Sequence, residues 1–357
     1  GDVYKRQLFM VGSVVLAAAL VGLVDPIVRL ISTPEEAVAG TTAYLTICFI
    51  GIPCITAYNV LASIFRGMGD SRSPMYFIAA ACVVNIGLDF FFMGALRLGP
   101  AGAALGTTLS QAVSVLLALC VILKRRSIRL SKSDFCPRKA TMKDILSIGL
   151  PVAAQDGFIQ VSFMLITIIA NQRGLTDAAA VGIVEKIISF LFLVPSSMLS
   201  TVSALGAQNI GAGKYDRVDD ILRYAIAIGV GFGAVMALLM QFIAPSMVRP
   251  FTSDEAVVKA GAAYIRSYIF DCLFAGIQFS FSGYFCAWGR SGLSFLHNTL
   301  SILLVRVPGA WLACRFFPQT LVPMGLAPAC GSLFSSIVCV LLYRWMKSQN
   351  KPTGNKD

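Results

Sequence analysis

Apolar runs of membrane-crossing length recur along the whole of this 357-residue chain. A helix needs about 20 apolar residues to cross the hydrocarbon core of a bilayer. Lipid offers the backbone no hydrogen-bond partner, so runs of this length satisfy their own backbone groups as helices. The chain is therefore predicted to be an all-α polytopic membrane protein. We predict ten transmembrane helices, at Leu8–Leu30, Ala43–Phe65, Met75–Gly94, Ala101–Leu123, Ile145–Ala170, Ala178–Leu205, Ile221–Ile243, Tyr264–Ala287, Leu293–Phe316 and Met324–Trp345.

The composition argues against a soluble domain and against nucleic-acid binding. Hydrophobic residues make up 57% of the chain and charged residues only 13%, too few to cover a soluble surface. The basic residues behind the net charge of +11 are distributed unevenly between the loops on the two sides of the membrane. If Lys5 and Arg6 lie on the cytoplasmic side, about 20 of the 29 Lys and Arg residues fall on that side, as the positive-inside rule expects. We therefore expect a multi-pass membrane protein with a cytoplasmic C-terminus. Its expected partners are membrane lipids and small molecules, with no nucleic acid.

An internal repeat divides the chain into two related parts. The stretch Pro26–Val38 reappears as Pro245–Val257, and the turn Gly69–Ser71 reappears as Gly289–Ser291. Duplicated membrane units of this kind are typical of secondary transporters, whose substrate path lies where the repeats meet. The second copy holds six spans, which predicts a complete protein of twelve helices in two lobes, built from parallel six-helix repeats.

The repeat also predicts the domain organisation and an incomplete beginning. Residues 8–123 would form the last four helices of the first lobe, residues 144–346 the complete second lobe and residues 347–357 a cytoplasmic tail. A basic cytoplasmic linker, residues 124–143, would join the lobes. Two further spans are expected before Gly1, and the polar stretch Gly1–Gln7 is interpreted as a cloning or assembly scar.

Metal, redox and nucleotide chemistry lack their sequence motifs. The ten cysteines form no CxxC pair, and the single His297 has no His or Cys neighbour at metal-ligand spacing. The Gly-rich string that ends in Lys214 is followed by Tyr215 and not by Ser or Thr, so it does not match a phosphate-binding loop. We expect no cofactor, no catalytic residues and no metal site other than one for a coupling ion.

Ionisable residues inside the predicted spans are the strongest functional signal, because each costs several kcal/mol in lipid. Asp89 is the best of them. Asn85 precedes it by four residues, which places both side chains on one helix face, and Thr107 lies early in the next helix. Carboxylate, amide and hydroxyl oxygens together suit a proton or Na+. The alternative is that Asn85 and Asp89 only form hydrogen bonds between helices.

The chain resembles the multidrug and toxic compound extrusion (MATE) family, in its prokaryotic, DinF-like branch. The resemblance covers residues 8–346 and implies a location in the bacterial cytoplasmic membrane. It is carried by three stretches, which are Arg66–Pro74, Asn85–Asp89 followed by Gly99–Gly106, and Gly149–Pro151 with Ala207–Lys214. It implies a cation-coupled antiporter, driven by H+ or Na+, that exports amphipathic or cationic organic compounds. It also implies that Asn85, Asp89 and Thr107 belong to the coupling-cation site of the first lobe. A fourth family group, an Asp on the first span, has no counterpart in this chain.

The second lobe departs from the family pattern. Where the seventh span of the family carries a Glu, this chain has Ile159 and Gln160. Further polar residues are candidates for the central cavity or a second-lobe site, with structural roles equally open: Gln155, Asp156, Gln160, Glu185, Asp271 and Arg306. Asp271 is expected to pair with Arg266 or Arg306 if its role is structural. The cavity wall is expected to be apolar, from Phe158, Phe163, Met164, Phe190, Phe192 and Met198.

Two other functions stay open at this point. A flippase for a lipid-linked saccharide would need several cavity arginines for its anionic substrate, and only Lys186, Arg266 and Arg306 are available in the spans. A non-transporting membrane sensor or assembly subunit would carry soluble segments, whereas the longest polar loop has about 20 residues. We therefore favour the antiporter, and expect a monomer.

Overall fold

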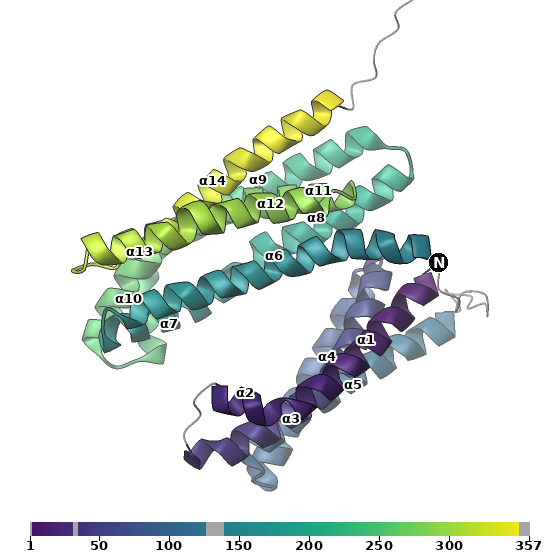
Figure 1. Cartoon of the computed structure of the whole chain (residues 1–357), viewed down its shortest axis with the longest axis horizontal. Coiled ribbons are helices and arrows are strands. Elements are labelled where there is room, and N and C mark those ends of the chain that lie inside the picture. Colours follow the sequence, from purple (N-terminus) through teal and green to yellow (C-terminus); the bar gives the residue numbers. More distant parts are fainter. Residues whose placement is uncertain (1, 31–34, 126–138, 350–357) are drawn as a thin grey trace, which may run out of the picture. The chain divides into compact units, whose positions relative to one another are not determined.

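The computed structural model describes the backbone of residues 2–30, 35–125 and 139–349. Side chains are described for residues 10, 12–29, 38–124 and 146–349. The chain divides into two compact units, residues 1–145 and 146–357, which are considered separately below. Within the described residues all regular structure is helical (Figure 1).

The first unit holds the helices drawn from purple to blue in Figure 1. They are α1 (Asp2–Gly22), α2 (Val24–Leu30), α3 (Glu35–Gly67), α4 (Arg72–Asp89), the π-helical turn η1 (Phe90–Ala95) and α5 (Gly99–Arg125). Apolar side chains of α3, α4 and α5 meet near one end of the unit, with Phe65 and Phe77 in edge-to-face contact at 5.5 Å between ring centroids. This cluster fixes how α3, α4 and α5 pack together.

The second unit holds the helices drawn from teal to yellow in Figure 1. They are α6 (Lys139–Asn171), α7 (Leu175–Leu191), α8 (Leu193–Gly211), α9 (Tyr215–Val248), the 3₁₀ turn η3 (Arg249–Phe251), α10 (Glu255–Tyr268), α11 (Phe270–Ala287), α12 (Ser291–Ser301), the π-helical turn η4 (Ile302–Arg306), α13 (Val307–Phe316) and α14 (Val322–Gln349). The span α10–α11 is central, since 67% of its most apolar stretch is buried.

Among the described residues, nine helical segments are long and apolar enough to cross a membrane. Eight of them contain a predicted span, and the ninth, Leu146–Asn171, begins one residue after the predicted start at Ile145. The remaining prediction, a single helix over Leu8–Leu30, is wrong. The helix stops at Gly22, and α2 begins at Val24 with Asp25 and Pro26 in its first turn. Proline has no backbone N–H and suits the first turn of a helix, which is where Pro26 lies in α2.

Several predicted boundaries differ from the helices or lie outside the described residues. The linker prediction ends at residue 143, but α6 begins at Lys139, and residues 126–138 are not described. Asp2 begins α1, so the stretch interpreted as a scar is helical from its second residue. The predicted tail begins at Lys347, where α14 still continues to Gln349, and residues 350–357 are not described.

Two helices of the second unit approach each other through glycines. A Cβ atom on Gly229 of α9 would lie 2.8 Å from the Cα atom of Gly276 on α11. Without large side chains between them, the two backbones make van der Waals contact, as small residues allow in membrane helix pairs. Gly231, slightly further along α9, faces open space instead.

This contact predicts that Gly229→Ala destabilises the protein, whereas Gly231→Ala does not. The alanine at 229 would push α9 away from α11, at a cost of about 1–3 kcal/mol. Both variants gain the same helix propensity, so their difference isolates the contact. Thermal unfolding of the purified chain in detergent measures it. Equal melting temperatures for the two variants would contradict this packing.

Candidate functional site

Asn85 and Asp89 lie one turn apart near the end of α4, as their spacing predicts. The helix does not end at Asp89 but continues directly into the π-helical turn η1. Wide turns of this kind inside α-helices are frequent at functional sites, because they change the direction of the neighbouring side chains. The carboxylate therefore lies where the regular hydrogen-bond pattern of the span changes.

The pair faces α5 at a position that has no side chain. A Cβ atom built on Gly106 would collide with Oδ1 of Asp89 and would lie 3.5 Å from Nδ2 of Asn85. Only glycine leaves this space to the carboxylate. Gly106 is thus a positioning residue that the sequence argument did not single out, although it closes the Gly99–Gly106 motif.

Two polar atoms of this pair are buried without a partner. Neither Nδ2 of Asn85 nor Oδ1 of Asp89 has a hydrogen-bond partner among the described residues. An unsatisfied buried polar atom costs about 1–3 kcal/mol, so such atoms call for an explanation. A bound cation or a proton at Oδ1 would supply the missing interaction of the carboxylate.

Thr107 does not take part in the contacts of this pair. Its side chain is exposed, and Oγ1 donates a hydrogen bond to the carbonyl oxygen of Ala103 in the same helix, at 3.0 Å. The structure therefore brings together Asn85, Asp89 and Gly106, with Thr107 beside them on the next position of α5. A role of Thr107 as a cation ligand stays a prediction.

In the second lobe, Asp271 and Arg306 form a buried ion pair. The side chain of Asp271 is fully buried on α11, and its Oδ2 lies 3.6 Å from Nη2 of Arg306 in η4. Nη2 also donates to the hydroxyl of Tyr268 at 2.7 Å, and the guanidinium lies 5.0 Å from the centroid of the Phe163 ring. Of the two predicted partners of Asp271, the structure selects Arg306, because Arg266 is exposed.

Glu185 belongs to the same region of the second lobe. Thr167 on α6 donates a hydrogen bond to its carboxylate, with oxygen–oxygen distances of 3.1 and 3.2 Å. Glu185 and Asp271 both lie within electrostatic reach of Arg306. Glu185 and Asp271 thus share Arg306 as their basic partner in a largely buried cluster. Thr167 and Tyr268 complete this cluster through their hydrogen bonds to Glu185 and Arg306, and the sequence analysis did not identify either residue.

The three polar residues predicted on α6 do not share one face. Gln155 is 1% exposed and accepts a hydrogen bond from Ser294 on α12 at 2.6 Å, so it points into the lobe. Asp156 and Gln160 are exposed. Their spacing of four residues places them on one face of α6. Gln155 therefore ties α6 to α12, and only Asp156 and Gln160 keep the exposure that a cavity position needs.

The predicted apolar wall is split in the same way. The exposed members are Phe158, Met164 and Phe190, at 38%, 65% and 74%. Phe163, Phe192 and Met198 instead pack within the lobe, against the two buried clusters of its core.

The sequence matches the MatE family model over residues 3–91 and 151–312, which is most of the chain. The chain belongs to the MatE family. Its relatives include the probable multidrug resistance protein YpnP of Bacillus subtilis, 30% identical over 336 residues, covering 93% of this chain and 74% of YpnP. The probable multidrug resistance protein NorM of Thermotoga maritima is 23% identical over 93% of this chain and 74% of its own length.

Solved structures share the fold of this MatE protein. A crystal structure of MATE in complex with MaL6 superposes with a TM-score of 0.92, covering 98% of this chain and 79% of that one at 21% identity. A mutant of the Vibrio cholerae MATE transporter VcmN gives a TM-score of 0.90 at 19% identity and covers 97% and 78% of the two chains. The MatE chain is thus a multi-pass, membrane-embedded member of a transporter family, with the helical two-lobe fold of MATE transporters.

The buried pair of the second lobe predicts a specific pattern of stability. Arg306→Met should destabilise the protein by about 3–5 kcal/mol, because it leaves Asp271 buried and unpaired. The double variant Asp271→Asn with Arg306→Met should recover part of this loss, since the fully buried charge is removed and only the half-buried Glu185, which keeps its hydrogen bond from Thr167, loses the guanidinium. Arg266→Met, at an exposed position, serves as the control. Thermal unfolding in detergent compares the variants, and a double variant no more stable than Arg306→Met would refute the pairing.

Proposed function

We propose that this MatE protein works as a cation-coupled antiporter that exports amphipathic, cationic organic compounds from a bacterial cell. The coupling ion is H+ or Na+, and no other cofactor takes part. The protein lies in the cytoplasmic membrane as a monomer, with its C-terminus in the cytoplasm. The names of its relatives YpnP, NorM and the multidrug export protein MepA of Staphylococcus aureus support multidrug export.

The buried, unpartnered Oδ1 atom of Asp89 is the observation that carries the coupling proposal. A carboxylate oxygen is a good ligand for Na+ and a good acceptor for a proton. Asn85 adds an amide to the same helix face, and Gly106 keeps the space beside the carboxylate open. A cation bound there neutralises Asp89 and lowers the cost of keeping it inside the bundle.

Charge balance at Asp89 then links the ion to the substrate. Binding of the ion from outside neutralises the carboxylate, rearranges the first lobe and weakens its hold on a cationic substrate. Release of the ion inside restores the negative charge and resets the carrier. Asp156 and Gln160 are the polar groups of α6 that we assign to the central cavity, because both are exposed.

A flippase would need free basic side chains for its anionic substrate, and Arg306 is not free to serve as one. Arg306 is engaged by Asp271 and Tyr268 within the second lobe, so its charge is already compensated. A lipid-linked pyrophosphate would therefore find no free buried arginine among the described residues there. The sensor or assembly-subunit alternative gains no supporting observation from the structure.

We expect Asp89→Asn to abolish ion-driven export, and Gly106→Ala to reduce it in the same way by displacing the carboxylate. Loss of a charge-assisted interaction of ~1.5–3 kcal/mol corresponds to roughly tenfold or more in ion affinity. Transport of a fluorescent organic cation by proteoliposomes with the intact transporter, first under a proton gradient and then under a Na+ gradient, measures the effect.

Gly87→Ala is the matched control, because a Cβ atom on Gly87 of α4 would meet open space. It should keep export at the level of the unmodified protein. Full export by Asp89→Asn under both gradients would show that this carboxylate does not couple the ion.

A further inference from the structure

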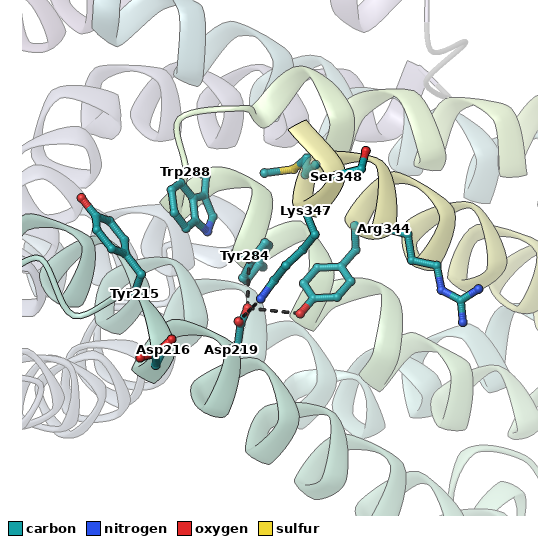
Figure 2. A pocket seen from close by; sticks show the side chains of 10 residues that line it. Tyr215, Asp216, Asp219, Tyr284, Trp288, Arg344, Lys347 and Ser348 are labelled. Atoms are coloured by element: carbon teal, nitrogen blue, oxygen red, sulfur yellow. Dashed lines mark hydrogen bonds and ion pairs between the residues drawn. The ribbon is translucent and has the colours of Figure 1, made fainter. Parts of the chain in front are cut away.

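The second lobe carries a cavity of about 820 Å³ at one end of its helices, lined by aromatic and charged side chains (Figure 2). Its residues come from the start of α9, the end of α11 and the last turns of α14. Tyr215 stacks on Trp288, with ring centroids 5.7 Å apart, and Tyr284 meets Tyr343 edge to face at 5.4 Å. None of these residues belongs to the sites described above.

Asp219 is held at the centre of this aromatic cavity. Its Oδ1 accepts hydrogen bonds from the hydroxyls of Tyr284 and Tyr343, both at 3.2 Å, and its Oδ2 pairs with the ammonium of Lys347 (Figure 2). The same ammonium lies 5.6 Å from the centroid of the Tyr343 ring. Aromatic rings attract ammonium groups through cation–π interactions, and a carboxylate adds charge-assisted hydrogen bonds that only an N–H-bearing ammonium can donate. The primary ammonium that takes this position in the structure is that of Lys347 itself.

The cavity lies at the ends of two candidate membrane spans. The span of α9 begins at Tyr215, and the span of α14 ends at Gln349. Charged residues dominate the first turns of α9, from Asp216 to Arg223, as expected for a helix that leaves the hydrocarbon core. Trp and Tyr side chains concentrate at the level of the lipid headgroups. A ligand of this cavity is therefore within reach of the headgroup region.

The charges that line the cavity balance each other. Asp216 and Asp219 carry two negative charges, and Arg344 and Lys347 carry two positive charges. A simple cation that displaced Lys347 would leave this ammonium without its carboxylate. A ligand with an ammonium and a phosphate a few atoms apart would satisfy both, because Lys347 could move from Asp219 to the phosphate.

We propose that this pocket binds the headgroup of an aminophospholipid, whose primary ammonium replaces that of Lys347 on Asp219 while Lys347 pairs with the lipid phosphate. The exchange breaks one ion pair and forms two. Half of the side chain of Lys347 is exposed, so it is free to make this move, whereas Asp219 is 17% exposed and stays fixed by its two tyrosines. Such a lipid would connect α9, α11 and α14 at this end of the lobe.

Native mass spectrometry of the purified intact chain tests the proposal. The probes are the dihexanoyl forms of phosphatidylethanolamine, phosphatidylcholine and phosphatidylglycerol, together with soluble phosphoethanolamine. We expect saturable binding of the ethanolamine lipid, with Asp219→Asn weakening it about tenfold or more through loss of a charge-assisted hydrogen bond. Asp220→Asn is the control, because this neighbouring carboxylate is 57% exposed, lies 3.7 Å from Arg223 and does not line the cavity.

The choline and glycerol lipids test the ammonium directly. A trimethylated ammonium cannot donate hydrogen bonds to Asp219 and a glycerol headgroup has no positive charge, so both should bind at least about fivefold more weakly. Equal binding of the three lipids, or equal binding by Asp219→Asn and Asp220→Asn, would overturn the proposal. If soluble phosphoethanolamine bound as tightly as the lipid, the proposal that the ligand is a membrane lipid would be wrong. The comparison of lipids on the unmodified chain keeps the test valid even if Asp219→Asn does not fold, and it needs no ion gradient or transport.

Discussion

Every ionisable group inside this membrane bundle must be neutralised, and the two lobes meet that requirement differently. In the second lobe, Asp271 is compensated from within the protein by Arg306, which also contacts Tyr268 and Phe163. Buried oxygens without a hydrogen bond occur on both acids, Oδ1 of Asp89 and both carboxylate oxygens of Asp271, but only Asp271 has a basic side chain within ion-pair distance among the described residues. A carboxylate paired with a buried base is neutralised by the protein, whereas one without a base is available to a mobile ion.

The internal repeat makes this contrast more specific. The turns at Gly69 and Gly289 are 220 residues apart (289 − 69), and the same offset carries Asp89 to Gly309, close to Arg306. Both spans contain a π-helical turn, η1 directly after Asp89 and η4 ending at Arg306, but at different positions, since the offset carries η1 to residues 310–315. Equivalent spans of the two lobes thus carry opposite charges.

Sequence patterns predicted the helical spans well, because the cost of exposing a backbone to lipid leaves few alternatives. They missed the break between α1 and α2, although Pro26 was a signal for it. They left the partner of Asp271 open between two arginines, since only packing decides which arginine points inward. The sequence patterns also missed the close approach of Asp89 to Gly106 and the aromatic pocket around Asp219. Both depend on how helices cross, and the pattern of a single helix does not contain this information.

Infrared difference spectroscopy of the reconstituted intact protein tests the central claim most directly, that Asp89 is the group that exchanges an ion while Asp271 does not. Carboxyl and carboxylate bands are compared between Na+-free and Na+-loaded samples and across pH. The account predicts an ion-dependent carboxyl signal that disappears in Asp89→Asn and persists in the double variant Asp271→Asn with Arg306→Met. A signal that survives Asp89→Asn, or vanishes in the double variant, would contradict it.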